Sequence, residues 1–571
     1  MSKPRSRAPL LWVGLLLIVC GILLANAIQT AGGIRIQDVR FTGTNDTPMS
    51  AHLYVPAGVT SKNPAPGILA VHGYFNSREA QSGFAIEFAR RGYVVLALDQ
   101  TGHGYSAPPA FANAFGGPDG LRYLRNLDIV DKNNIGLEGH SMGGWTVVNA
   151  AAAIPDGYRS IVLEGSSTGK PFAPEGSPRF PRNLAVVFSK YDEFSGVMWQ
   201  APDATLVTQS KKLQAVFGTD AEIEPGRVYG SIDDGTARVL YTPSITHPMD
   251  HISPTAIGHS IDWFARTLKG GLSKPPNDQT WYWKEFGTAI ALIGFVVFVL
   301  GLLEVMLAWP CFAALQRGDA NGGDASSRNS RWWFSLAFGA FMPALTLLPF
   351  MYLGGSLFPA SAWLPQTFTT EIAFWALLNA AIVLGAGLLP GGPKTVPLDQ
   401  FTRCAAFALC AFAIAYALVA TVQFLFNLDF RFWFLAFRPM SRSNVDAFPI
   451  YLVAFSIFFV TVLRSLHTVL TPGAASAAGQ YLVAVVVLAG GFVLFLLVQY
   501  GLLLSTHHLV ELHMSDSLRT IISINFVPVM SVVGLASTFL FRRTGRSLPG
   551  ALVCALFTTW YVLVGQATQG A

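Results

Sequence analysis

The sequence predicts a two-part protein: an α/β domain with a doubly wound, mostly parallel sheet, followed by an all-α polytopic transmembrane domain. Three observations predict this. Between Ile34 and Asn277, short apolar runs alternate with helix-like segments, a pattern typical of parallel sheets covered by helices on both faces. From Trp281 onward, most of the chain consists of apolar stretches near the length that crosses a bilayer. The composition agrees, because 52% of the 571 residues are hydrophobic and only 12% are charged.

We expect the chain to divide into four segments. Residues 1–28 are an N-terminal membrane anchor or a signal peptide, and residues 34–270 form the α/β domain. Residues 271–282 are a linker, and residues 283–571 form a transmembrane domain of about eight helices.

The first segment fits two alternatives. Lys3, Arg5 and Arg7 precede an apolar run over residues 10–24, which is typical of a retained anchor and of a signal peptide. The tripeptide Ala25-Asn26-Ala27 fits a small-residue cleavage site. Under both alternatives the α/β domain is translocated to the other side of the membrane.

The alternation within the α/β domain predicts its elements in order. Residues 34–42 and 51–55 are expected to form an initial antiparallel pair. The further expected strands cover residues 67–71, 93–98, the run before Ser141, 160–163, 184–188 and 238–241. The expected helices cover residues 84–91, 120–127 and 254–268.

One stretch has the form of a strand, a sharp turn and a helix. Gly139-His140-Ser141-Met142-Gly143 follows the apolar run Ile135-Gly136-Leu137 and opens onto a helix-like segment that starts near Trp145. A serine at such a turn adopts strained dihedrals, so the residues two positions away must be small, as Gly139 and Gly143 are. The helix that follows directs its free N–H groups at negative charge developing there. A glycine-rich turn of any α/β domain also fits the pattern, so the stretch alone does not establish catalysis.

Two further motifs occur after the preceding strands. His72-Gly73 follows the third strand, Asp99-Gln100-Thr101-Gly102-His103-Gly104-Tyr105-Ser106 follows the fourth, and Gly139-His140-Ser141-Met142-Gly143-Gly144 follows the fifth. With these motifs in this order, residues 35–269 resemble the α/β-hydrolase fold. Residues 129–136 are similar to the segment before the nucleophile in dienelactone-hydrolase-like and serine-peptidase-like members. The resemblance implies a serine hydrolase with Ser141 as its nucleophile.

The resemblance also implies the base. Serine needs a base to remove its proton, and in this family a histidine after the last strand supplies it. His247 has that place, and Pro254 and Ala256 match the family layout beyond it. His251 is the alternative base. His103 and His140 resemble motif histidines whose usual role is structural.

The acid is expected just after the strand over residues 184–188. Asp192 stands there, and a carboxylate in this place would fix the tautomer of His247 and stabilise its imidazolium. Glu193 and Glu164 are the alternatives, since each follows a predicted strand closely. The long separation between Asp192 and His247 implies an insertion over residues 195–235.

The oxyanion hole is implied by the same resemblance. Its donors would be the backbone N–H groups of Tyr74, just after His72-Gly73, and of Met142, just after Ser141. No cofactor and no metal are expected. The five cysteines all lie in or beside apolar segments, so we expect neither a disulfide framework nor a cysteine metal site. One polar cluster, formed by His507, His508, Glu511 and His513, fits a metal site or, as we prefer, the polar end of a membrane helix.

The second half contains about eight apolar segments. They cover residues 286–307, 333–353, 372–389, 404–426, 448–463, 481–504, 521–541 and 551–564. The positive-inside rule places most basic loop residues in the cytoplasm; they are Arg317, Arg328, Arg331, Lys394, Arg403, Arg464, Arg542, Arg543 and Arg546. The loop over residues 427–447 is the exception. This predicts a multi-pass protein of the cytoplasmic membrane with the hydrolase-like domain outside.

Two features of this half are ambiguous. Glu304 is an intramembrane carboxylate near a helix end, where such groups are usually paired or reach the interface. Residues 424–438 are rich in aromatics and fit either an interfacial platform or an aromatic belt, of which we favour the belt.

These observations leave three hypotheses for function. The first is a membrane-bound serine hydrolase that cleaves an ester, thioester or amide acyl bond of a small-molecule or lipid-like substrate beside membrane lipid. The second is an acyltransferase that uses the same acyl-enzyme. The third is a transporter or assembly protein with a non-catalytic domain. Residues 165–183 are too short for a helical lid, so the site is expected to be open. The net charge of +5 is modest and gives no sign of nucleic-acid binding.

Overall fold

The fold is described from a computed structural model. It describes residues 8–316, 328–386, 398–474, 476–513, 516–565 and 568–570. Lys3, Arg5 and Arg7 of the first segment lie outside these residues, as do Arg317 and Lys394 of the predicted cytoplasmic loops. The chain forms two compact units. One consists of Leu23–Gly287 with Leu502–Val510 and Ala567–Ala571, and the other of Met1–Ile22, Thr288–Gly501 and Glu511–Gln566.

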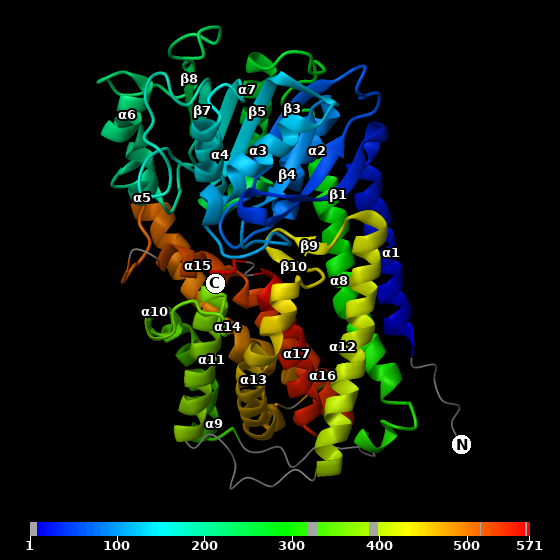
Figure 1. The fold of residues 1–571 in the computed structure, drawn as a ribbon. Helices are drawn as coiled ribbons and strands as arrows, with labels where there is room; N and C mark the ends of the chain where they lie inside the picture. Colours follow the sequence, from blue (N-terminus) through cyan, green and yellow to red (C-terminus); the bar gives the residue numbers. More distant parts are fainter. Residues whose placement is uncertain are drawn as a thin grey trace. The chain divides into compact units, whose positions relative to one another are not determined.

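The first unit contains an eight-stranded sheet with the strand order β1-β2-β4-β3-β5-β6-β7-β8 (Figure 1). Strands β1 and β2 are antiparallel, β2 is antiparallel to β4, and the other neighbours are parallel. The strands are β1 Arg35–Thr42, β2 Pro48–Val55, β3 Ala65–Val71, β4 Val94–Asp99, β5 Val130–His140, β6 Ser160–Glu164, β7 Leu184–Val187 and β8 Arg238–Tyr241. The predicted antiparallel start and mostly parallel sheet are confirmed.

Helices cover both faces of this sheet. They are α2 Ser82–Arg90, α3 Gly117–Asn126, α4 Met142–Ala153, α5 Ser195–Trp199, α6 Lys211–Phe217 and α7 Pro254–Thr267. Leu69 and Val71 face one core with α3 and α4, whereas Ile68 and Ala70 face another with α2 and α7. Successive side chains of a strand point to opposite faces, so a strand buried on both faces is continuously apolar. This explains why β3 is buried throughout.

The segment predicted as a linker is bound to α2. The Glu87 carboxylate accepts hydrogen bonds from the backbone N–H groups of Thr280 (2.7 Å) and Trp281 (3.0 Å). Trp281, the first residue of α8 Trp281–Met306, is buried in the core beside α2. Arg91 pairs with Glu87 at 2.8 Å and donates to the carbonyl of Pro275 at 2.6 Å. Glu87 thus caps the start of α8, where unpaired N–H groups favour negative charge.

The remaining elements are mostly helical. In addition to α8, the helices are α1 Pro9–Gln29, α9 Ser330–Leu345, α10 Leu347–Leu357, α11 Thr367–Gly385, α12 Leu398–Phe426, α13 Arg442–Ser465, α14 Ala477–Thr506, α15 Asp516–Ile524, α16 Phe526–Thr544 and α17 Leu548–Gly565. Among the described residues, eight helices are long and apolar enough to cross a membrane, or nine if α9 and α10, bent by 49°, form one span. These helices are compatible with a multi-pass membrane protein, and the all-α prediction is confirmed.

Two predicted apolar segments are broken by a single residue. Thr346 separates α9 from α10, and Asn525 separates α15 from α16. A proline, Pro349 or Pro528, follows three positions after each break. A proline ring clashes with the carbonyl of the residue four positions earlier and removes one helical hydrogen bond. In both places that residue is the last one of the preceding helix.

Close packing joins α1 to α8 in the helical unit. A Cβ at Gly294 would lie 2.8 Å from both the backbone nitrogen of Ile18 and the Cβ of Leu17, and a Cβ at Gly14 would collide with the backbone of Phe298. Small residues that let helix backbones approach closely are typical of membrane helix interfaces.

The helical unit also contains paired charges. Glu304 accepts a hydrogen bond from Arg543 at 2.8 Å, as expected for a carboxylate near a helix end. Arg519 pairs with Glu371 at 2.8 Å and with Asp516 at 3.1 Å, and all three side chains are buried. The aromatic stretch after α12 forms a short hairpin of β9 Phe430–Phe432 and β10 Leu435–Phe437.

Candidate active site

Ser141 lies at the turn between β5 and α4. Its φ of 53° and ψ of −121° are a strained conformation for a residue with a side chain. A Cβ at Gly139 would collide with the carbonyl oxygen of Gly143, and a Cβ at Gly143 would collide with the carbonyl oxygen of Val71. Only glycine fits at both positions, so the tight turn holds Ser141 at the carboxyl edge of the sheet, at the start of α4.

The structure brings Asp192 and His247 together. Asp192 follows β7, His247 follows β8, and Asp192 Oδ2 lies 2.8 Å from His247 Nδ1. Both side chains are buried. Burial lowers the pKa of His247, but the Asp192 carboxylate and other acidic groups outweigh it and raise the pKa above 6.5. A carboxylate on Nδ1 leaves Nε2 free to accept a proton.

The alternative base has a different environment. His251 packs against the ring of His140, with centroids 4.0 Å apart, and lies edge-on to Phe84. Burial, and then the neighbouring histidines His140, His247 and His72, hold the pKa of His251 well below 6.5. It is therefore a neutral side chain within a packed layer.

The alternative acids also have other partners. Glu193 Oε2 accepts a hydrogen bond from the backbone N–H of His247 at 2.9 Å, and burial followed by the charge of Asp192 raises its pKa to about 8. Glu164, the last residue of β6, is buried and accepts a hydrogen bond from Ser260 of α7. Burial raises the pKa of Glu164 well above 4.5. Each of these alternative acids therefore has its own hydrogen-bond partner in the fold.

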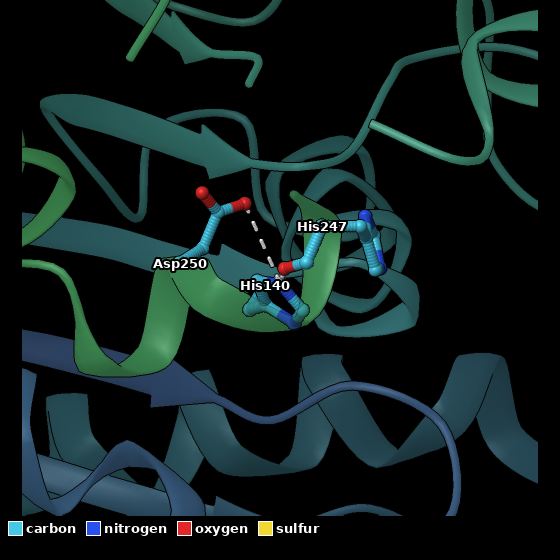
Figure 2. A group of neighbouring side chains, drawn as sticks. All are labelled: His140, His247 and Asp250. Atoms are coloured by element: carbon cyan, nitrogen blue, oxygen red, sulfur yellow. Dashed lines mark hydrogen bonds and ion pairs between the residues drawn. The ribbon is translucent and has the colours of Figure 1, made fainter. Parts of the chain in front are cut away.

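His140, His247 and Asp250 form a compact polar group (Figure 2). Their potential ligand atoms lie within 4.8 Å of one another, the one such group found in the described ranges. His140 Nε2 lies 3.2 Å from the carbonyl oxygen of His247 and 3.7 Å from Asp250 Oδ2. Asp250 Oδ1 accepts a hydrogen bond from Ser189 at 2.6 Å. The group therefore links the loop that carries Asp192 to the turn that carries His247.

The polar cluster near the end of α14 has separate contacts. His507 stacks on Tyr191, with ring centroids 5.8 Å apart. His513 stacks on Tyr352, and Glu511 accepts hydrogen bonds from Ser517. His507, His513 and Glu511 therefore each have a neighbour outside the cluster.

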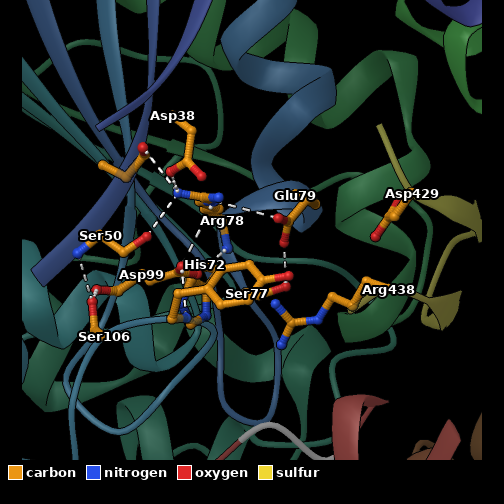
Figure 3. Close-up of polar contacts among 12 residues, drawn as sticks. Asp38, Ser50, His72, Ser77, Arg78, Glu79, Asp99, Ser106, Asp429 and Arg438 are labelled. Atoms are coloured by element: carbon orange, nitrogen blue, oxygen red, sulfur yellow. Dashed lines mark hydrogen bonds and ion pairs between the residues drawn. The ribbon is translucent and has the colours of Figure 1, made fainter. Parts of the chain in front are cut away.

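Sequence reasoning missed a buried arginine in the loop after β3. Arg78 Nη1 donates to Asp38 Oδ1 and Ser50 Oγ, both at 2.7 Å (Figure 3). Its Nε lies 3.3 Å from Glu79 and 3.7 Å from Asp99, and its backbone N–H donates to Asp99 at 2.8 Å. A buried charge requires such partners. Arg78 thereby fixes the loop that starts at His72-Gly73.

The loop after β3 lies against Ser141. A Cβ at Gly73 would come within 3.2 Å of the Cβ of Ser141, so glycine permits this approach. Tyr74 follows directly, and its ring stacks on Phe111 with centroids 5.9 Å apart. Met142 is the first residue of α4, where backbone N–H groups have no partner within the helix.

Comparisons with known proteins agree with this architecture. A family model described as the alpha/beta hydrolase fold matches residues 66–195. A protein of Mycobacterium phage D29, provisionally named non-heme haloperoxidase, is 31% identical over 114 residues, which are 20% of this chain and 40% of that protein. The chain thus spans less than half the length of this curated relative.

The chain is also similar to solved structures of esterases, at low identity. Brefeldin A esterase, a bacterial homologue of human hormone sensitive lipase, has 13% identity and a TM-score of 0.31, covering 47% of this chain and 88% of its own. An esterase of Pyrobaculum calidifontis has 16% identity and a TM-score of 0.30, covering 47% and 96%. From the family match and the strand order around Ser141, we conclude that the chain contains an α/β-hydrolase domain.

Proposed function

We propose that this protein is a membrane-bound serine hydrolase that cleaves an acyl bond through Ser141, His247 and Asp192. The observation that carries the proposal is the 2.8 Å contact between Asp192 and His247 Nδ1 at the edge of the sheet where Ser141 lies. A domain that only binds has no need of a buried, oriented acid–base pair beside a strained serine.

The proposed chemistry follows from the positions of these groups. His247 Nε2 takes the proton from Ser141 as the serine oxygen attacks the acyl carbon. The negative oxygen of the tetrahedral intermediate accepts hydrogen bonds from the N–H groups of Met142 and Tyr74. The intermediate collapses to an acyl-enzyme, and His247 returns the proton to the leaving group. Water, activated by the same imidazole, then releases the acid and restores Ser141.

Aromatic side chains near Ser141 support an apolar substrate. Phe111 and Phe172 are 44% and 42% exposed, although large hydrophobic side chains are normally buried. Phe111 stacks on Tyr74. The ring centroids of Phe172 and Trp145 are 4.5 Å apart, and Trp145 lies one turn after Ser141 on α4. Residues 165–183 contain no helix that could cover them. We infer an ester, thioester or amide with an apolar acyl or alcohol group, including a lipid-like substrate.

Labelling of the full-length protein in detergent with a fluorophosphonate probe tests the proposal. We expect a covalent adduct on the unmodified protein and none on Ser141→Ala, and p-nitrophenyl esters should be hydrolysed only by the former. An unlabelled, inactive wild-type protein would favour the transporter or assembly alternative. Products formed with and without an added alcohol distinguish hydrolysis from acyl transfer.

The proposed location is the cytoplasmic membrane with the hydrolase domain outside. It rests on the basic residues of the predicted cytoplasmic loops and on the membrane-length helices. The close packing of Gly14 against α8 supports a retained anchor rather than a cleaved signal peptide. Protease added to intact spheroplasts should digest the hydrolase domain. Protection until lysis would place the domain in the cytoplasm.

A further inference from the structure

The segment after α17 lies in the same compact unit as the hydrolase domain. Thr568 and Gln569 are 6% and 3% exposed. Thr568 Oγ1 lies 2.7 Å from His103 Nε2 and 3.0 Å from the backbone nitrogen of Phe75. These partners belong to two different loops, the one after β3 and the one after β4.

The hydrogen-bond directions at Thr568 follow from its partners. The backbone N–H of Phe75 can only donate, so the hydroxyl oxygen of Thr568 accepts from it. His103 Nδ1 lies 2.9 Å from the carbonyl oxygen of Thr101, which can only accept, so the ring proton is on Nδ1. His103 Nε2 is then an acceptor, and the Thr568 hydroxyl donates to it. One hydroxyl therefore bridges both loops.

The next residue binds through its backbone. The N–H of Gln569 donates to the carbonyl of Gly102, and its carbonyl accepts from the N–H of Ala110, each at 2.6 Å. A Cβ at Gly102 would lie 2.7 Å from the carbonyl oxygen of Gln569, and its φ is +69°. Glycine at this position thus permits the segment to approach the loop.

These contacts occur beside the proposed oxyanion hole. Phe75 follows Tyr74, whose N–H is a proposed donor, and Phe75 has a φ of +44°, which is strained for a residue with a side chain. Such a conformation persists only where the surroundings hold it. The hydrogen bond from the Phe75 N–H to Thr568 is one of the contacts that hold it.

We propose that residues 568–570 act as a strap that positions the oxyanion loop, with Thr568 as a positioning residue for catalysis. The inference rests on the proposed hydrolase function. It adds a requirement that neither the hydrolase fold nor the proposed triad contains: the segment after the last membrane helix completes the site.

The test compares Thr568→Val with Thr568→Ser in the full-length protein. Valine keeps the shape and removes the hydroxyl, whereas serine keeps the hydroxyl. Misplacing an oxyanion donor should lower kcat for a p-nitrophenyl ester by about 10- to 100-fold, with KM changed less than about threefold. Serine should restore kcat to within about threefold. Thr208→Val is the matched control, because Thr208 hydrogen-bonds Glu222 on an exposed surface.

A second readout does not depend on turnover. Amide hydrogen exchange of the peptide containing Phe75 should become faster in Thr568→Val and stay unchanged in Thr568→Ser and Thr208→Val. Gln569→Pro is a second variant, for the case that valine at 568 impairs folding. It removes the N–H bonded to Gly102 and should lower kcat and speed the exchange at Phe75 as expected for Thr568→Val.

The outcomes are distinguishable. An active wild-type protein with unchanged kcat in Thr568→Val and Gln569→Pro refutes the strap, whether or not exchange at Phe75 changes. An equal loss of kcat in the serine and valine variants also refutes it, since the hydroxyl would then not matter. A wild-type protein without Ser141-dependent turnover refutes the proposed function instead.

Discussion

Asparagine at position 192 removes the carboxylate from the proposed triad with almost no change of shape. Asp192 Oδ2 lies 2.8 Å from His247 Nδ1, and both side chains are buried. The contact is therefore a charge-assisted hydrogen bond in a region of low dielectric constant. Such a bond contributes roughly 1.5–3 kcal/mol of free energy. In the proposed mechanism it stabilises the imidazolium that forms when Ser141 loses its proton.

The expected loss of rate follows from this free energy. At about 1.4 kcal/mol per tenfold change, the lost bond alone slows acylation by roughly 10- to 150-fold. An asparagine amide that donates to Nδ1 also favours the tautomer with its proton on Nε2, which cannot accept the serine proton. We therefore expect Asp192→Asn to lower kcat/KM by about 10²- to 10⁴-fold.

The assay is hydrolysis of a p-nitrophenyl ester as a function of pH. Activity should rise as the neutral imidazole forms, above the ordinary histidine pKa of 6.5, because acidic groups raise the pKa of His247. Without the Asp192 carboxylate this rise should move to lower pH, since burial then lowers the pKa with less opposition.

Glu193→Gln is the matched control, because it changes the neighbouring carboxyl in the same way. With a pKa of about 8, Glu193 is mostly uncharged at pH 7, and a glutamine can still accept the hydrogen bond from the His247 N–H. We expect its kcat/KM to stay within about threefold of wild type. A large loss in Glu193→Gln together with a small one in Asp192→Asn would refute the assignment of the acid.

Four further predictions follow from the structure. The raised pKa of Glu193 stabilises the fold below pH 4.5, and this stability is lost as the pH rises to about 8, so Glu193→Gln should flatten the decline of the unfolding temperature over that window. His247→Ala should lower kcat by about 10³-fold or more and His251→Ala by far less; the reverse order of activities would show that His251 is the base. Gly294→Leu should destabilise the helical unit by about 1–3 kcal/mol, because its side chain would meet the backbone of Ile18, whereas an unchanged unfolding temperature would contradict this packing. EDTA should leave ester hydrolysis unchanged, since side chains and backbone groups supply every proposed step, and loss of activity that zinc restores would overturn that prediction.

Local patterns predicted much of the fold. The strands, the turn at Ser141 and the apolar segments follow from hydrophobic periodicity, segment length and the need for glycine at positions 139 and 143. The breaks at Thr346 and Asn525 were also readable in principle, since Pro349 and Pro528 mark them. The apolar segments do not show these breaks, because hydropathy is a mean over many residues and the single proline that produces a kink changes it little.

The site was predictable only as a set of candidates. The order of strands placed Ser141, two histidines and three carboxylates near one edge of the sheet, but it did not decide which pair would meet. Asp192 and His247 are 55 positions apart, and their contact depends on the paths of two loops. Burial gives Glu193 and His251 environments that differ from those expected of loop residues. This burial is likewise a property of the whole domain.

The sequence by itself determined the fold class, the tight turn at Ser141 and the apolar segments, because each depends on residues that are neighbours along the chain. Only the tertiary structure decided that Arg78 fixes the loop after β3, that Arg519 pairs with Glu371, and that Thr568 lies against His103. These contacts join residues as far as 465 positions apart. The physical reason is that a hydrogen bond or an ion pair forms where folding brings two groups together, and no local pattern records that distance.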